Sequence, residues 1–87
     1  MTIERVRTYR GISERAARHY LTRVGGELND DGSVRGDGWR ATVSSETVGI
    51  GPTLTLTEVT VAFEGEEEGT LGDVIERFSR KAIRAGG

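Results

Sequence analysis

The chain has 87 residues, of which 34% are hydrophobic and 30% charged, with a formal net charge of −2 and no cysteine. The near-neutral charge does not indicate a nucleic-acid-binding protein, and the lack of cysteine excludes disulfides, thiolate metal sites and cysteine nucleophiles. No apolar run is long enough to span a membrane and the N-terminus has no apolar signal core, so we expect a cytoplasmic protein with no membrane partner.

The N-terminal part of the chain predicts an edge strand followed by a helix. Residues 3–9 tolerate a helical spacing, but their basic residues and Gly11 favour a strand. Apolar residues then recur at spacings of three, four and five, as on one face of a helix. They are Ile12, Ala16, Ala17, Tyr20, Leu21 and Val24. Ser13 is a suitable N-cap for this helix, and Gly25-Gly26 a suitable end.

The middle of the chain predicts antiparallel strands. Residues 29–32 are typical of a turn, here between short strands around residues 27–28 and 34–35. Apolar and polar residues alternate over residues 39–43, which indicates a half-buried strand. Turn-forming residues at 49–52 then join this strand to the next as a long hairpin.

The second strand of that hairpin changes its apolar parity. Leu54 and Leu56 have even residue numbers, whereas Val59, Val61 and Phe63 have odd ones. Successive side chains of a strand point to opposite faces, and an extra residue is needed to shift the pattern. We therefore predict a β-bulge near Thr57-Glu58.

A second helix is predicted after the acidic loop of residues 64–69. Its apolar face comprises Leu71, Val74, Ile75, Phe78 and Ala82. Thr70 and Asp73 have the spacing of a capping box at its start. A chain of this length forms one core, so residues 1–87 are expected to be a single α+β domain. The most economical packing is a two-layer sandwich, with both helices on one face of an antiparallel sheet.

Residue types that catalyse reactions or bind metals are isolated along the chain. His19 lies on the polar side of the first helix, and no motif supplies an orienting carboxylate or a second ligand. The loop that begins at Asn29 resembles the start of a calcium loop, but its glycine is at the fourth position and Arg40 is at the twelfth. Gly49 and Gly51 begin a G-x-G pattern that no helix follows. We therefore expect no catalytic residue, cofactor or metal.

Both helices carry basic residues that could form one surface. They are Arg15, Arg18 and Arg23 on the first helix, and Arg77, Arg80, Lys81 and Arg84 on the second. If the helices lie on the same side of the sheet, this surface would meet phosphates or an acidic partner. Glu14 and Glu76 interrupt it, so a solvated charged face is the default interpretation and the binding surface is the alternative. A protein is the expected partner, and nucleic acid is less favoured.

The final Gly86-Gly87 has two interpretations. A diglycine tail has no side chains and can extend into a narrow adenylating site, which would leave its carboxylate open to attack on ATP. Helices also commonly end in glycine, so these residues can equally be a helix end.

A small, acidic, cysteine-free chain that ends in Gly-Gly resembles the archaeal ubiquitin-like small modifiers and the MoaD-type sulfur carriers. The internal pattern resembles the C-terminal domain of MoaD-related proteins. It comprises Tyr9-Arg10-Gly11-Ile12, Gly25-Gly26-Glu27, Gly36-Asp37-Gly38-Trp39 and the helix end from Phe78 to Gly87.

Each resemblance implies a non-enzymatic role. For the modifiers, it implies that an activating enzyme adenylates Gly87, which then becomes a thiocarboxylate or forms an isopeptide bond. The β-grasp domain of those proteins ends in a strand, whereas a helix is predicted here. For the MoaD-related domain, the resemblance implies non-covalent binding to a carrier protein or its enzymes.

Overall fold

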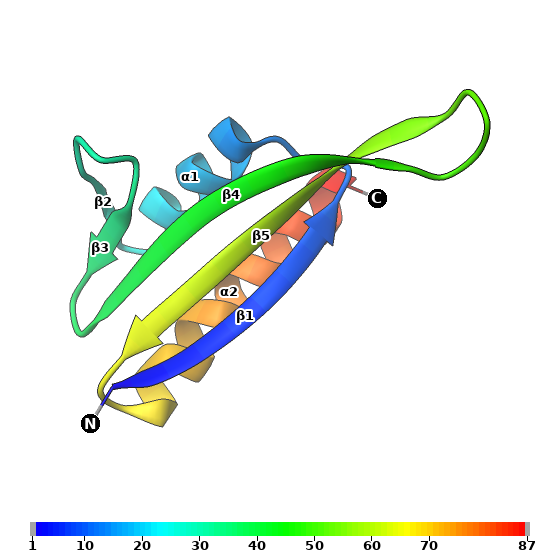
Figure 1. The fold of residues 1–87 in the computed structure, drawn as a ribbon. Helices are drawn as coiled ribbons and strands as arrows, with labels where there is room; N and C mark the ends of the chain where they lie inside the picture. The colour runs from blue at the N-terminus through cyan, green and yellow to red at the C-terminus, as the bar shows by residue number, and fades with distance from the viewer. Residues whose placement is uncertain (1, 87) are drawn as a thin grey trace.

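The computed structural model describes the backbone of residues 2–86 and the side chains of residues 2–83. Its elements follow the predicted order (Figure 1). They are β1 (Ile3–Arg10), α1 (Glu14–Arg23), β2 (Glu27–Leu28), β3 (Val34–Gly36), β4 (Trp39–Gly49), β5 (Thr55–Gly65) and α2 (Glu68–Gly86). Neither of these helices is long and apolar enough to cross a membrane.

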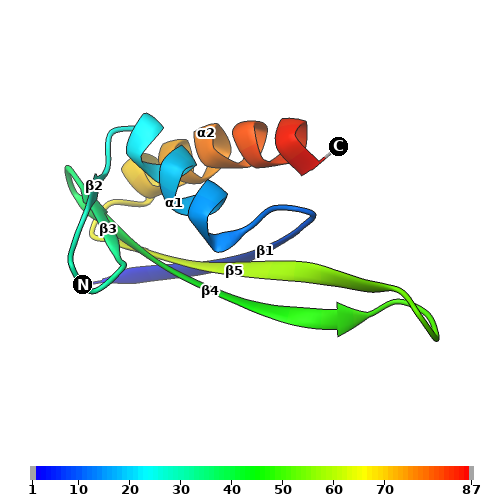
Figure 2. The ribbon, with the colours of Figure 1, turned by 90° about the horizontal axis from the view of Figure 1, so that it is seen from above.

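The strands form one antiparallel sheet in the order β1-β5-β4-β3-β2. Both helices lie on the same face of this sheet, and the opposite face has no covering layer of described residues (Figure 2). The predicted α+β sandwich is therefore confirmed. Residues 3–10 form an edge strand, as predicted, because β1 pairs with β5 alone.

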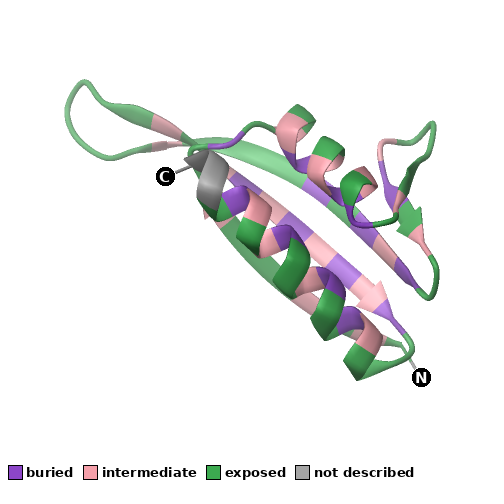
Figure 3. Cartoon of the chain, turned by 180° about the vertical axis from the view of Figure 1, so that it is seen from behind, coloured by how far each residue is buried: buried purple, intermediate pink, exposed green. Residues whose placement is uncertain are grey.

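The core lies between the helices and the sheet (Figure 3). Val59, Val61 and Phe63 of β5 are fully buried in the same core cluster as Phe78 of α2. The rings of Phe63 and Phe78 make an edge-to-face contact, with their centroids 5.8 Å apart. Such a pair adds about 1 kcal/mol to the free energy that burial of the rings provides.

Tyr9 connects the edge strand β1 to α2. Its ring meets Phe78 edge-to-face at 5.1 Å, and its hydroxyl is 2.7 Å from Ser79 Oγ. Burial raises the pKa of the Tyr9 phenol, although the Ser79 hydrogen bond and the charge of Arg7 oppose that rise. These contacts hold β1 to the helix layer.

Two local predictions are wrong. The β4–β5 pairing is continuous from Trp39↔Gly65 to Gly49↔Thr55, so there is no bulge near Thr57-Glu58. The second helix begins at Glu68, and the Leu71 N–H donates to the Glu67 carbonyl at 3.1 Å. Thr70 therefore lies in the first turn and does not cap it. The prediction for α1 is confirmed, since Ser13 Oγ accepts from the Ala16 N–H at 3.0 Å.

The β4–β5 hairpin projects beyond the rest of the sheet (Figures 1 and 2). β3 pairs with β4 only as far as Ala41, and β1 pairs with β5 only as far as Glu58. We call residues 45–57 the distal hairpin. It explains the parity change: Leu56 pairs with Val48 on the face away from the helices, where no core requires a bulge.

Candidate functional site

The last turn of α1 and the interior of α2 form a basic groove of about 250 Å³, which we call the helix groove. It is lined by Arg23 from the last turn of α1 and by Arg77, Arg80 and Lys81 from α2. The spacing of Arg77, Arg80 and Lys81 places them on one side of α2, because residues three and four apart are neighbours on a helix.

Two of the four cations in the helix groove have acidic neighbours on their own helix. Arg80 Nη2 is 2.6 Å from Glu76 Oε1, and Arg77 Nη1 is 3.8 Å from Asp73 Oδ2. More than half of each arginine side chain is exposed, so each pair contributes less than about 1 kcal/mol. Within residues 2–83, neither Arg23 nor Lys81 has an ion-pair partner. The helix groove therefore retains a positive charge that an anionic ligand can meet.

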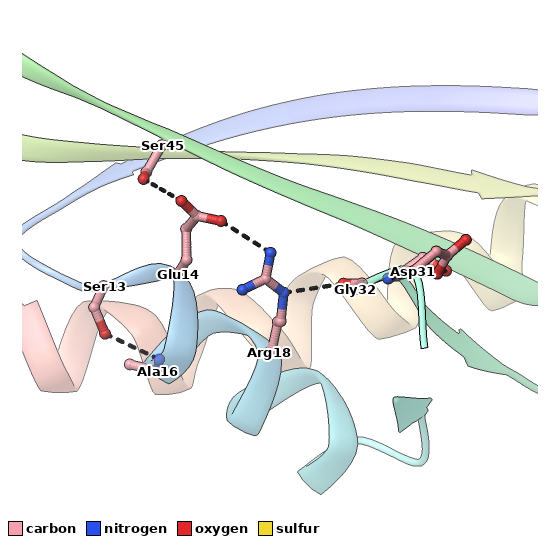
Figure 4. A network of polar contacts seen from close by, with 8 residues as sticks. Ser13, Glu14, Ala16, Arg18, Asp31, Gly32 and Ser45 are labelled. Atoms are coloured by element: carbon pink, nitrogen blue, oxygen red, sulfur yellow. Dashed lines mark hydrogen bonds and ion pairs between the residues drawn. The ribbon is translucent and has the colours of Figure 1, made fainter. Parts of the chain in front are cut away.

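Arg18 lies away from the helix groove, within a polar network that joins α1 to the sheet (Figure 4). Its Nη2 is 2.9 Å from Glu14 Oε1, and its Nε donates to the Gly32 carbonyl at 2.9 Å. Arg15 lines a separate depression together with Arg18, His19, Thr22 and Leu28. The structure therefore separates Arg15 and Arg18 from the basic residues of α2. The side chain of Arg84 lies outside the described part of the chain.

Glu14 is the centre of that network. Its Oε2 accepts from Ser45 Oγ at 2.5 Å, so a carboxylate on α1 is fixed to β4 where the distal hairpin begins. This hydrogen bond, followed by the contacts with Arg18, lowers the pKa of the Glu14 carboxyl. The network therefore favours the ionised carboxylate and holds α1 above β4.

In the loop that resembles the start of a calcium site, side-chain oxygens accept hydrogen bonds from other residues of the same loop. Asp31 Oδ1 accepts from the Ser33 N–H at 2.9 Å and from the Ser33 hydroxyl at 2.6 Å, and these bonds lower the pKa of Asp31. Asn29 donates to Ser33 Oγ at 3.2 Å. His19 is exposed, as predicted. Among the described side chains, no three His, Asp or Glu groups are placed to hold a metal ion.

Among the described side chains, Ala82 is the last core residue of α2 before the terminal glycines. Ala82 is 3% exposed, whereas Ile83 is 68% exposed. The helix continues to Gly86, and the predicted attachment residue Gly87 lies outside the described residues. Within the side chains that the structure describes, α2 therefore leaves the core at Ile83.

Comparison with known proteins gives one finding for the whole chain. No curated protein matches the sequence. A family model described as "Archaeal MoaD-like protein" matches residues 5–87. This range includes both helices and all five strands, except for the first two residues of β1. The chain therefore belongs to the family of archaeal MoaD-like proteins.

Proposed function

We propose that this protein is a non-catalytic member of the sulfur-carrier and ubiquitin-like modifier system, and that Gly86-Gly87 is its site of activation. The observation that carries the proposal is that the described side chains of α2 end with a buried Ala82 followed by an exposed Ile83, three residues before Gly86. Membership of the MoaD-like family supports a carrier role. The partner would be the protein that activates the carrier, and this chain would supply no catalytic side chain.

Activation requires the end of α2 to unwind, because the helix continues to Gly86. The terminal turn of a helix opens at a cost on the order of 1 kcal/mol or less, and a glycine in a helix lowers that cost. Unwinding from Ile83 onward leaves Ala82 and the core in place. The resulting segment, residues 83–87, spans about 17 Å when extended. That length allows the glycines to enter an active site while the folded domain remains outside it.

The chemistry needs only the α-carboxylate of Gly87. The carboxylate oxygen attacks the α-phosphorus of ATP on the activating enzyme, pyrophosphate leaves, and an acyl-adenylate forms. Hydrosulfide then displaces AMP, which leaves with the C–O bond electrons, and the product is a thiocarboxylate without any change of oxidation state. Alternatively, a lysine amine of a target displaces AMP and forms an isopeptide bond. Gly86 and Gly87 present no side chain to obstruct either attack.

The decisive experiment compares the tagged chain with a variant that lacks Gly86-Gly87, each expressed in the native host. Both are purified under denaturing conditions and their intact masses are measured. We expect the full chain to give either a species in which one oxygen is replaced by sulfur or covalent conjugates. Both products should be absent from the truncated variant. An unmodified full chain under conditions of sulfur demand would overturn the proposal.

Ala85→Pro tests the requirement for unwinding. Proline disfavours a helical conformation in the residue before it, so α2 should end by Arg84 in this variant. We expect the rate of adenylation to rise by up to about fivefold, which corresponds to ~1 kcal/mol of unwinding no longer required. Ala85→Gln keeps a strong helix former at this position and should leave the rate unchanged or lower.

The helix groove favours a second candidate function, in which the protein binds an anionic partner. Arg23, Arg80 and Lys81 converge on it from two helices, whereas Arg15 and Arg18 lie elsewhere. The test measures binding of polyglutamate and of single-stranded RNA to Lys81→Glu, with Arg15→Glu as the matched control. Specific binding should weaken in Lys81→Glu alone and fall steeply with salt. Equal losses in the two variants would instead indicate a non-specific effect of net charge.

A further inference from the structure

The two edges of the sheet differ in their protection. β1 forms one edge along its full length and carries the charged residues Glu4, Arg5, Arg7 and Arg10. The other edge is formed by β2 at one end and, beyond Ala41, by β4, where β3 no longer pairs with it. No strand of the described chain covers residues 42–49 on that side. We call this segment the free edge.

The hydrogen bonds at the hairpin identify which backbone groups the free edge exposes. The Ile50 N–H donates to the Leu54 carbonyl at 3.0 Å, so even-numbered residues of β4 direct their N–H and C=O groups toward β5. Antiparallel ladders alternate these groups strictly from one residue to the next. The odd-numbered residues of the free edge therefore direct their N–H and C=O groups outward. They are Val43, Ser45, Thr47 and Gly49.

The composition of the free edge favours pairing with another strand. Its sequence is TVSSETVG, in which Glu46 is the single charged residue. Natural edge strands that avoid association carry charges, proline or a bulge. β1 has the charges, but the free edge has one charge, no proline and, given its continuous register, no bulge. A segment with high β-propensity and low net charge is the type that adds a further strand.

An exposed apolar surface lies beside the free edge. Val48 and Leu56 pair across the distal hairpin on the face turned away from the helices. Ile50 and Leu54 continue this surface toward the tip and are 53% and 61% exposed. An exposed apolar cluster next to unpaired backbone groups has the two features of a strand-addition interface.

We propose that two copies of this chain associate through their free edges, with β4 antiparallel to β4 across a two-fold axis. The two-fold axis places the same face of both copies on one side, and residues opposite one another in an antiparallel pair share a face. Even-numbered residues of one copy therefore lie opposite even-numbered residues of the other, and odd-numbered residues lie opposite odd-numbered ones. A register with Glu46 opposite Glu46 places like charges together and is unfavourable. A register with Thr47 on the axis instead places Glu46 opposite Val48.

The register with Thr47 on the axis also matches the backbone and the available space. Ser45 faces Gly49 of the second copy, Thr47 faces Thr47, and each of these outward-facing pairs can exchange both N–H···O bonds. Glu14 lies above Ser45, where glycine in the second copy leaves room for it. The partner's β3 pairs with β4 only up to Ala41, so it lies beyond the end of the shared segment. The Val48 side chains of both copies then gather near the axis on one face.

Proline substitution tests this association without breaking the hairpin. Thr47→Pro removes an outward-facing N–H and leaves the β4–β5 ladder intact, because Thr47 donates nothing to β5. The wild-type chain should sediment as a dimer at high concentration. Thr47→Pro removes two hydrogen bonds at the axis, one from each copy, and should raise the dimer dissociation constant on the order of thirtyfold.

Thr8→Pro is the matched control on the other edge. The Gly11 N–H donates to the Thr57 carbonyl at 3.2 Å, so by the same alternation Thr8 directs its N–H outward from β1. This variant should dimerise like the wild type. If a proline variant does not fold, Thr47→Lys and Thr57→Lys form a second pair. Thr47 and Thr57 are cross-strand partners on the same face, but only Thr47 lies on the free edge.

Amide hydrogen exchange gives an independent measurement. Protection at Ser45, Thr47 and Gly49 should rise with protein concentration, whereas the amides of Ser44 and Glu46 should be protected at every concentration. A wild-type chain that remains monomeric at millimolar concentration would overturn the proposal. So would a dimer that persists unchanged in both Thr47→Pro and Thr47→Lys.

Discussion

The two halves of the β4–β5 hairpin have the same backbone pairing and opposite side-chain environments. Near the turn between β3 and β4, Ala41 pairs with Phe63 beneath the helices, and both residues are fully buried. In the distal hairpin, Val48 pairs with Leu56 in the same continuous register, but on the uncovered face. The apolar residues change faces while the strand continues without interruption.

This difference shows that apolar parity and strand register are independent properties. Where one layer covers a strand along its whole length, the apolar residues of the strand must all lie on the covered face. A strand that is covered over part of its length has no such requirement in the uncovered part. The helices cover the half of the hairpin that contains Val59, Val61 and Phe63, and they do not cover Leu54. Apolar residues on the other face of the distal hairpin are therefore not required to point toward the core.

The largest expected difference between the halves is in the response to truncation of a large side chain. Phe63→Ala removes a fully buried ring and should lower the free energy of unfolding by about 3–5 kcal/mol. Leu56→Ala should lower it by less than ~1 kcal/mol, because Leu56 is only partly buried. Urea denaturation of dilute protein measures both values. Similar losses in the two variants would mean that the distal hairpin packs against a layer in the monomer.

A smaller difference is expected from the addition of one methyl group. A Cβ at Gly36 would lie 2.2 Å from Cε2 and Nε1 of Trp39, so Gly36→Ala should cost about 1–3 kcal/mol and change the fluorescence of the single tryptophan. Gly49 has no atom within 4 Å of such a Cβ, so Gly49→Ala is the matched control. It should leave stability unchanged or raise it by up to ~1 kcal/mol. An undisturbed tryptophan spectrum in Gly36→Ala would show that the indole has room to move.

Periodicity predicted the elements whose apolar faces meet the core. The helical stripe through Leu21 and the strand alternation at Trp39 each indicate burial on one side, and both residues are buried. The same rule gave a wrong bulge at Thr57-Glu58, because it assigns every apolar residue to the core. Exposed apolar residues of an interface look the same in the sequence, so parity alone does not separate Leu56 from Val59.

The beginning of α2 was mispredicted for a different reason. Thr70 and Asp73 have the spacing of a capping box that would start the helix at Leu71, yet the helix begins at Glu68, most of a turn earlier. Capping patterns consist of common residues and occur by chance inside first turns. Glu68 also fits an early start, since a carboxylate is favourable at the positive end of the helix dipole and Glu68 lies 3.3 Å from Arg5.

The helix groove could be predicted only in part. Helical spacing shows that Arg77, Arg80 and Lys81 share one side of α2, because that relation lies within one element. Which residue of α1 joins them depends on how the helices cross, which no local pattern determines. The structure selects Arg23, whereas the contacts with Glu14 and Gly32 hold Arg18 elsewhere.

The smallest expected effect lies at the boundary between the two halves, where Ser45 donates to Glu14. Ser45→Ala removes the main cause of the lowered Glu14 pKa, so that pKa should rise toward its ordinary value of 4.5. A carboxyl group whose pKa is lowered by folding stabilises the fold at pH values above its unfolded-state pKa. This contribution is lost as the pH falls through the folded-state pKa. The cost of Ser45→Ala should thus be about 0.5 kcal/mol at neutral pH, since Glu14 is more than a third exposed.

That cost should diminish below pH 4.5 and vanish once Glu14 is protonated in both the folded and unfolded states. Carboxyl NMR titration measures the pKa directly, and urea denaturation at neutral and acidic pH measures the difference in stability. Ser44→Ala is the control, because Ser44 lies on the uncovered face beside Thr60 and makes no described contact with Glu14. A loss in Ser45→Ala that is the same at both pH values would attribute the stabilisation to packing. A loss confined to neutral pH would attribute it to the ionised carboxylate, and so to a charge on α1 that fixes the point at which the hairpin leaves the helices.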